Sequence, residues 1–372
     1  MAEFRVDYSE CEGRKAECPD GCGMCCLCQP EILDSEIPFF RKNHPDRICR
    51  TKGPDGYNAI KLKKGRGSCV FLNGDRRCEV YDHRTTYCRQ FPYHIYVSDR
   101  IQVEMDLSCR GLWTGKGNDA KAEAEDLIKR AEARIRDALP DASEVYRQFR
   151  QYASEAGVMR DPEFLRGTVE ETLYRFTEPE FLCKVLEASS DLPNMSIADA
   201  LKPGKADLRA LDAAAREAAL ESLATDDPLS MPVYCSEDFS WNLFAADGGK
   251  IEWLTVDDEG EFKHRGYVNA MDISLPQLTD EGREVLADYI RILNRRDSFM
   301  GSVFFLEDAN GYEDDLANAY YGSMASAALD VMWRAALLDH FFGTGFGRDG
   351  IREAVMFYDM DRLDAPAIGA FI

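Results

Sequence analysis

The sequence of 372 residues lacks long apolar runs. No stretch of about 18 consecutive apolar residues occurs, so no transmembrane helix is expected. The polar, acidic residues 1–15 do not contain the apolar segment of a signal peptide. No Walker motif occurs, and no order of Ser, His and Asp typical of a hydrolase triad. These absences predict a cytoplasmic protein without membrane contact, and they identify no catalytic residue.

Basic side chains are also scarce. The chain has 45 Lys and Arg against 67 Asp and Glu, which gives a net charge of −22 at pH 7. Residues 41–116 are the exception, with 16 basic and 8 acidic side chains, whereas residues 117–372 have 26 basic and 50 acidic ones. The acidic remainder would repel phosphates, which argues against nucleic-acid binding. The basic segment is either a solvated surface or a source of positive charge for an anionic thiolate centre.

Cysteine, by contrast, is abundant. Of the 13 cysteines, 11 precede residue 110, and five lie in the run CPDGCGMCCLC at residues 18–28. Because thiols stay reduced in the cytoplasm, this density favours a metal site over disulfide bonds. Thiolates bind soft metals strongly. The N-terminal third is therefore predicted to build a zinc or iron–sulfur site.

Within this run, Cys22 and Cys25 have the two-residue spacing that lets two sulfurs bind one metal ion across a tight turn. Gly21 and Gly23 would supply the backbone freedom for that turn. The adjacent Cys26 does not easily join the same ion, because neighbouring side chains often diverge. The Cys25-Cys26 pair favours a polynuclear cluster, two separate centres, or one ligand beside a redox or substrate-facing thiol.

Further candidate ligands follow at wide spacing in the basic segment. The full predicted ligand set is Cys18, Cys22, Cys25, Cys26, Cys69, Cys78, Cys88 and Cys109. Eight thiolates could form two four-cysteine centres of zinc or [4Fe–4S] type, or one cluster with spare thiols. Cys11, Cys28 and Cys49 are interpreted as bystanders, and Cys183 and Cys235 as isolated buried side chains.

Three segments resemble the YkgJ-like cysteine-cluster family, also described as the CxxCxxCC zinc- or iron-chelating domain. They are CPDGCGMCC (18–26), CVFLNGDRRCEVYDHRTTYCRQFPY (69–93) and DLSC (106–109). The positions of the second segment that follow the family pattern are Cys69, Phe71, Leu72, Cys78, Tyr81, Arg84, Cys88, Arg89, Phe91 and Pro92. Thr85 stands where that pattern usually has proline. The resemblance covers about residues 15–112 and implies metal or iron–sulfur binding.

The chain is also distantly similar to the flagellin lysine-N-methylases, which have a similar CC knuckle and later cysteines. Those proteins resemble users of an iron–sulfur cluster and S-adenosylmethionine, so the resemblance implies that this chain could share such chemistry. Arg84 and Arg89 bracket Cys88. They are candidate hydrogen-bond donors around the ligands, or ordinary surface charges.

The surplus of thiols, the adjacent pair and the basic segment favour an iron–sulfur cluster, of [4Fe–4S] type, over zinc. The expected function is redox or S-adenosylmethionine-linked modification of a protein partner, by an iron–sulfur-dependent oxidoreductase or a protein methyltransferase. The alternative is a non-catalytic zinc-binding or metal-delivery module. Whether the chain is an enzyme stays open, and the expected partner is a protein substrate or a redox protein.

The remaining pattern predicts an α+β protein in three regions: a cysteine-rich module (1–115), a helical connector or bundle (116–228) and an acidic α+β domain (229–372). A helix from Ala120 is expected to end at Pro140, where a second helix follows. The run GSVFFLE (301–307) is predicted as a short strand. The apolar tail PAIGAFI (366–372) is expected to dock on the protein.

Overall fold

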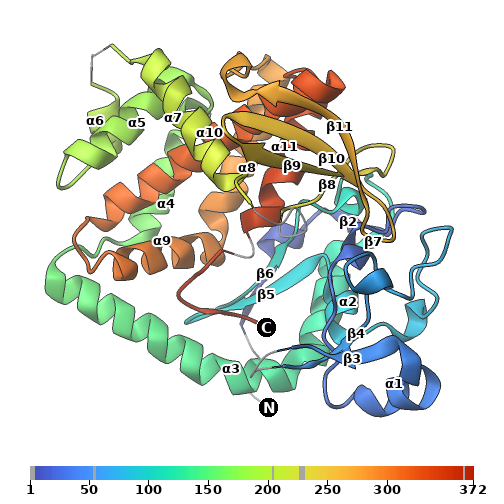
Figure 1. Cartoon of the computed structure of the whole chain (residues 1–372). Coiled ribbons are helices and arrows are strands. Elements are labelled where there is room, and N and C mark those ends of the chain that lie inside the picture. The colour runs from blue at the N-terminus through green and yellow to red at the C-terminus, as the bar shows by residue number, and fades with distance from the viewer. Residues whose placement is uncertain (1–4, 53–55, 203–204, 226–230, 363–364) are drawn as a thin grey trace.

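The structure is a computed structural model, which describes residues 5–52, 56–202, 205–225, 231–362 and 365–372. Small sheets and many helices give an α+β fold, as predicted (Figure 1). The helices are α1 (Ile37–Asn43), α2 (Thr86–Gln90), α3 (Ala120–Ala156), α4 (Pro162–Glu171), α5 (Pro179–Asp191), α6 (Ile197–Ala200), α7 (Leu208–Ser222), α8 (Asp280–Arg295), α9 (Asp297–Ala309), α10 (Leu316–Phe342) and α11 (Arg348–Arg362). The predicted boundary between residues 228 and 229 lies outside the described residues.

In the part of the chain that the structure describes, the strands form two four-stranded sheets and two short ribbons. One sheet has the order β1 (Val6–Asp7), β6 (Ile101–Met105), β5 (Tyr93–Val97) and β12 (Ala370–Phe371). The other has the order β11 (Phe262–Asn269), β10 (Lys250–Val256), β9 (Trp241–Asp247) and β8 (Tyr234–Cys235). The ribbons pair β2 (Lys15–Ala16) with β7 (Asn118–Asp119), and β3 (Ile48–Arg50) with β4 (Asn58–Ile60).

The first sheet joins segments from both ends of the sequence. Strand β1 lies parallel to β6, while β12 lies antiparallel to β5 on the opposite edge. Ile372 extends this pairing, because its backbone N–H donates to the carbonyl of Ile95 at 3.0 Å. The predicted docking of the apolar tail is thereby confirmed, with Ile368 only 7% exposed.

Two predictions about secondary structure are wrong, one about where a helix ends and one about a strand. Helix α3 does not end at Pro140 but continues through it to Ala156, with a total length of 37 residues. Proline removes one backbone donor and crowds the preceding turn, but buried positions on both sides of it, Ile135 and Phe149 among them, hold the helix on the core. The run 301–307 is part of α9 and not a strand, because a short apolar run does not distinguish a strand from a buried helix.

Most buried apolar side chains of the described residues form one cluster, whose members range from Cys11 to Ile368, and a smaller separate cluster contains Phe40, Cys69 and Phe71. Helix α10 forms much of it, with apolar and small side chains buried on all sides, including Trp333 at 0% exposure. A helix that is apolar around its whole circumference belongs in the interior of a protein. Helices α5 and α11 pack against it (Figure 1). As for membranes, the described residues include no helix long and apolar enough to cross a bilayer.

The basic segment of the N-terminal region contacts an acidic loop of the C-terminal region. Lys63 lies 3.3 Å from Asp258, and Arg66 lies 2.8 Å from Glu261. The backbone N–H of Ser68 also donates to the carbonyl of Asp258 at 2.9 Å. In Figure 1 the blue N-terminal region accordingly lies beside the gold sheet β8–β11. The uneven charge of the sequence is thus partly neutralised within the molecule.

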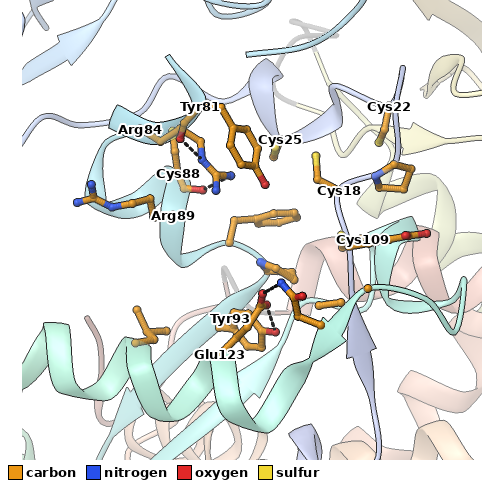
Figure 2. A pocket seen from close by; sticks show the side chains of 18 of the residues that line it. Cys18, Cys22, Cys25, Tyr81, Arg84, Cys88, Arg89, Tyr93, Cys109 and Glu123 are labelled. Atoms are coloured by element: carbon orange, nitrogen blue, oxygen red, sulfur yellow. Dashed lines mark hydrogen bonds between the residues drawn. The ribbon is translucent and has the colours of Figure 1, made fainter. Parts of the chain in front are cut away.

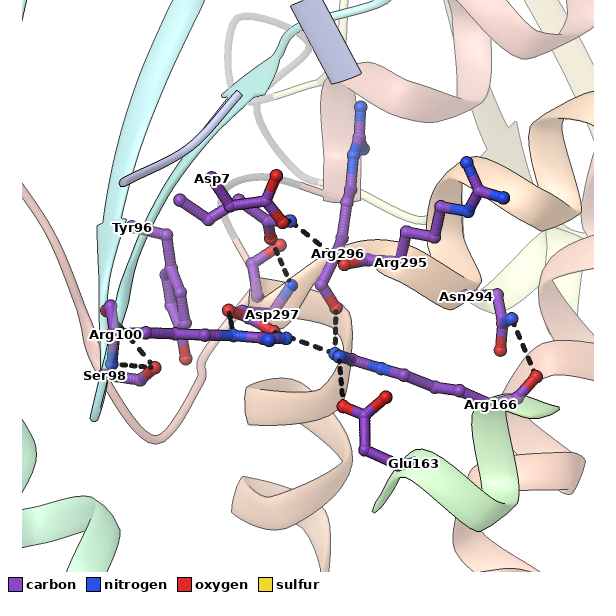
Figure 3. Close-up of polar contacts among 12 residues, drawn as sticks. Asp7, Tyr96, Ser98, Arg100, Glu163, Arg166, Asn294, Arg295, Arg296 and Asp297 are labelled. Carbon is purple, nitrogen blue, oxygen red and sulfur yellow. Dashed lines mark hydrogen bonds and ion pairs between the residues drawn. The ribbon is translucent and has the colours of Figure 1, made fainter. Parts of the chain in front are cut away.

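Buried ionic groups join the first sheet to α4 and α9. Asp297 pairs with Arg100 from the turn between β5 and β6, and with Arg166 of α4 at 2.8 Å (Figure 3). Nearby, Glu104 of β6 accepts hydrogen bonds from the backbone N–H and the hydroxyl of Ser298. Glu104 is fully buried, and this desolvation raises its pKa to about 7, although Arg296 opposes the shift.

The raised pKa of Glu104 leads to a prediction about how the stability of the protein depends on pH. The native state binds a proton on Glu104 that the unfolded chain has released, so stability falls as pH rises from about 4.5 to about 7. The E104Q variant cannot ionise, and its amide still accepts from the Ser298 N–H. We expect E104Q to be more stable than the native protein by about 1–3 kcal/mol near pH 8, and similar to it near pH 5. Urea unfolding at both pH values measures this, and an equal difference at both would contradict it.

Candidate metal centre

The CPDGCGMCCLC run folds as a turn followed by a short helix. Gly21 and Gly23 have φ angles of 86° and 61°, in the left-handed region that favours glycine, as the sequence predicted. The 3-10 helix Met24–Leu27 begins directly after Gly23 and presents Cys25 and Cys26. The Cys26 N–H donates to the Gly23 carbonyl at 3.0 Å, which closes the turn.

The second group of cysteines is attached to this turn by backbone hydrogen bonds. The N–H of Cys69 donates to the carbonyl of Cys26 at 2.7 Å. Cys78 follows a tight turn whose ends meet at the bridge between Leu72 and Cys78. Cys88 lies in α2, where the Thr85 hydroxyl accepts from the Cys88 N–H at 3.5 Å. Thr85, the departure from the family pattern, thus serves as the N-cap of this helix.

Cys109 precedes the 3-10 helix Arg110–Leu112, which packs against the segment leading to Cys18. Gly111 permits this approach, since a Cβ atom there would lie only 1.8 Å from the Glu17 carbonyl oxygen. Two segments that carry predicted ligands are therefore in direct backbone contact.

A substitution at Gly111 tests this contact. We expect G111A to lower the free energy of unfolding by about 1–3 kcal/mol, because the added methyl group forces the two backbones apart. The matched control is G74A, where an added Cβ has no atom within 4 Å. Urea denaturation measures both variants, and equal losses in G111A and G74A would show that the close approach contributes nothing.

Five of the eight predicted ligands face a cavity of about 670 Å³ (Figure 2), whereas Cys26, Cys69 and Cys78 do not line it. Cys18, Cys22, Cys25, Cys88 and Cys109 line it. The opposite wall comes from the first turns of α3 and from Tyr93, whose hydroxyl donates to Glu123 at 2.8 Å. The cavity thus places thiols on one side and a hydrogen-bonded carboxylate on the other.

Cys25 is at the centre of this arrangement. It hydrogen-bonds Cys26 and interacts electrostatically with the remaining predicted ligands, which are Cys18, Cys22, Cys69, Cys78, Cys88 and Cys109. Within the described ranges, however, no three His, Cys, Asp or Glu side chains stand close enough to hold one metal ion as they are oriented. The fold thus gathers the predicted thiols in one region around Cys25.

The pKa values of these thiols follow their surroundings. The hydrogen bond with Cys26 raises the pKa of Cys25 well above its ordinary value. Desolvation raises the pKa of Cys18 to about 11 and that of Cys69 to about 12. The hydrogen bond from Cys235 instead lowers the pKa of Cys22 to about 7. A metal cation that binds here must displace protons from most of these thiols.

The two predicted arginines line the same cavity. Arg84 stacks on Tyr81, with its guanidinium carbon 3.8 Å from the ring centroid, and its Nη1 donates to the Cys88 carbonyl at 3.4 Å. Arg89 pairs with Glu36 at 3.1 Å. Positive charge beside a thiol-rich cavity suits an anionic metal centre, and the donor set fits zinc or iron–sulfur ligation. A direct role of either arginine toward a bound centre stays a prediction.

One cysteine near this site was missed by sequence reasoning. Cys235 is buried, as predicted, but it is not isolated, because its sulfur lies 3.9 Å from that of Cys22. No local signal in the sequence links residues 213 positions apart, so only the fold shows this pair. Among the predicted bystanders, Cys11 is fully buried, and Cys49 accepts a weak hydrogen bond from Gln29 at 3.6 Å.

Comparison with known proteins bears on this same region. Residues 17–110 match the CxxCxxCC family, whose description reads "Putative zinc- or iron-chelating domain". The match includes all eight predicted ligands and ends one residue after Cys109. It supports metal binding in general, and the similarity to flagellin lysine-N-methylases is not shown. No curated protein and no solved structure matches the chain. Cys235 lies outside the matched CxxCxxCC domain.

Proposed function

We propose that the CxxCxxCC domain binds an iron–sulfur cluster. The observation that carries this proposal is the gathering of the predicted thiols around Cys25, described above. A mononuclear zinc site takes four protein ligands, which leaves the adjacent Cys26 and several neighbours without a role. A polynuclear cluster uses ligands from separate segments, as this fold supplies them.

The surroundings suit such a cluster. When bound, an iron–sulfur cluster supplies electron transfer. Arg84, Arg89 and Arg110 line the cavity and place positive charge near the thiols. The cavity of about 670 Å³ also extends from the thiols to α3, which gives a second molecule access to them. This favours redox or S-adenosylmethionine-linked modification of a protein partner as the use of the site.

Zinc is the second candidate metal. The spacing of Cys22 and Cys25 across the Gly23 turn suits a tetrahedral ion, and the family description includes zinc as well as iron. A zinc site would give a structural or metal-delivery module without redox chemistry.

Anaerobic purification of the full chain decides between the two metals. We expect brown protein with broad visible absorption and with iron and acid-labile sulfide in similar amounts. Colourless protein that contains zinc, without iron or sulfide, would overturn the iron–sulfur proposal. If the protein is brown, electron paramagnetic resonance of its reduced form distinguishes a [2Fe–2S] from a [4Fe–4S] cluster.

A further inference from the structure

A cysteine of the C-terminal region lies against the predicted metal centre. Cys235 ends β8, the edge strand next to β9, and it pairs with Trp241 in the sheet register. Its sulfur lies 3.9 Å from the sulfur of Cys22, a cavity-lining thiol of the CxxCxxCC domain. The side chain is only 3% exposed, so the contact lies inside the molecule.

Hydrogen bonds hold both partners of this contact in place. The indole N–H of Trp241 donates to the carbonyl of Cys22 at 3.0 Å. Arg110, next to the predicted ligand Cys109, donates from Nε to the carbonyl of Cys235 at 2.6 Å. Cys235 is thereby tied to two segments that carry predicted ligands.

The cation of Arg76 strengthens the same interface. Its guanidinium lies 3.9 Å from the centroid of the Trp241 ring, and its Nη1 donates to the carbonyl of Phe239 at 2.6 Å. Arg76 and Arg110 both act electrostatically on the sulfur of Cys235. Two cations near a pair of sulfurs offset the negative charge that thiolate ligands would add.

The distance between the sulfurs of Cys22 and Cys235 can be compared with the spacing of two thiolates on one metal ion. Two thiolates on one tetrahedral ion, with metal–sulfur bonds of about 2.3 Å, lie about 3.8 Å apart. The separation of 3.9 Å between Cys22 and Cys235 matches that spacing. A disulfide bond would need the sulfurs at about 2.05 Å, so the two thiols form a hydrogen bond and not a disulfide, at a spacing that two ligands of one ion could keep.

We propose that Cys22 and Cys235 are ligands of the same metal ion, so that the C-terminal region completes a centre begun by the CxxCxxCC domain. This inference rests on the metal binding proposed above and adds a ligand to it. In a [4Fe–4S] cluster each iron takes one cysteine, so the pair fits a mononuclear ion or one iron of a [2Fe–2S] cluster. A metal ion bound in this way would link residues 22 and 235 across the interface.

The test compares four variants of the full chain, purified anaerobically: C22S, C235S, the double variant and C183S. Cys183 is the matched control, since it is equally buried but lies in α5 beside Glu187. Iron, zinc and sulfide per chain are measured, together with metal retention against a chelator. We expect C235S to retain metal at least about 10-fold less well than the native protein. Even the loss of a residue that only hydrogen-bonds a ligand lowers metal affinity about 10- to 100-fold.

Because both sulfurs would bind one ion, the double variant should lose little more than C22S alone. C183S should behave as the native protein. C235A serves as a second variant, and near-ultraviolet circular dichroism shows whether each protein is folded. Native metal content in folded C235S or C235A would overturn the inference, and so would a Cys22–Cys235 disulfide in peptide maps of the anaerobic native protein.

The two proposals fail in different ways. If the native protein contains only zinc, the iron–sulfur proposal is wrong, and loss of zinc in C235S still supports the shared ligand pair. If the native protein contains iron and sulfide that C235S keeps in full, the iron–sulfur proposal stands and the ligand pair is wrong. A native protein without any bound metal would contradict both.

Discussion

Replacement of Cys25 by serine is expected to cause the largest loss of metal among the cysteine substitutions. Cys25 interacts with every other predicted ligand, directly with Cys26 and electrostatically with the rest. Serine keeps the size of the side chain but is a poor ligand for soft metals. We expect C25S to lose roughly 10-fold or more of its metal affinity. Metal analysis and visible absorption of the anaerobic protein measure this loss.

The control for C25S is C49S in the same domain. Cys49 lies on β3, accepts a weak hydrogen bond from Gln29 and does not line the cavity. We expect C49S to keep native metal content. Since metal binding contributes to the folding of such domains, C25S should also unfold at lower urea concentration. Native metal content in C25S would show that Cys25 is not a ligand, despite its central position.

Replacement of Arg296 by methionine is expected to cause the largest loss of stability. Arg296 follows α8 and is only 1% exposed. Its Nη1 lies 2.7 Å from Asp359 of α11, and its Nη2 lies 2.8 Å from Glu10 of the N-terminal segment. Nη2 also donates to the Met105 carbonyl of β6 at 2.7 Å. One guanidinium therefore connects three parts of the chain. Figure 3 shows the Arg296 side chain pointing away from the contacts of Asp297 with Arg100 and Arg166.

Removing this cation leaves Glu10 and Asp359 buried without their counter-charge. Loss of one partner of a buried ion pair costs about 3–5 kcal/mol. We expect R296M to lose that much in free energy of unfolding, measured by urea denaturation. The control is R295A, because the Arg295 side chain is 58% exposed and lies 3.9 Å from Glu170. An exposed pair contributes about 0–1 kcal/mol. Equal losses in the two variants would contradict a structural role of the buried network.

Local patterns were sufficient where one segment decides its own structure. The glycine turn before Cys25 needed left-handed backbone, and Gly21 and Gly23 supplied it. Helix α3 and the run 301–307 were misjudged for the opposite reason, since burial against distant segments decided both.

The sequence by itself determined the chemistry of this protein: many thiols, their spacing and a basic segment around them, which together predict a thiolate metal site. The tertiary structure alone decided which groups meet. It brought the acidic loop at Asp258 onto the basic segment, and it placed Cys235 against Cys22. The physical reason is that ligand type and turn preference are properties of residues and their near neighbours. Contact between positions 213 residues apart depends instead on how sheets and helices pack.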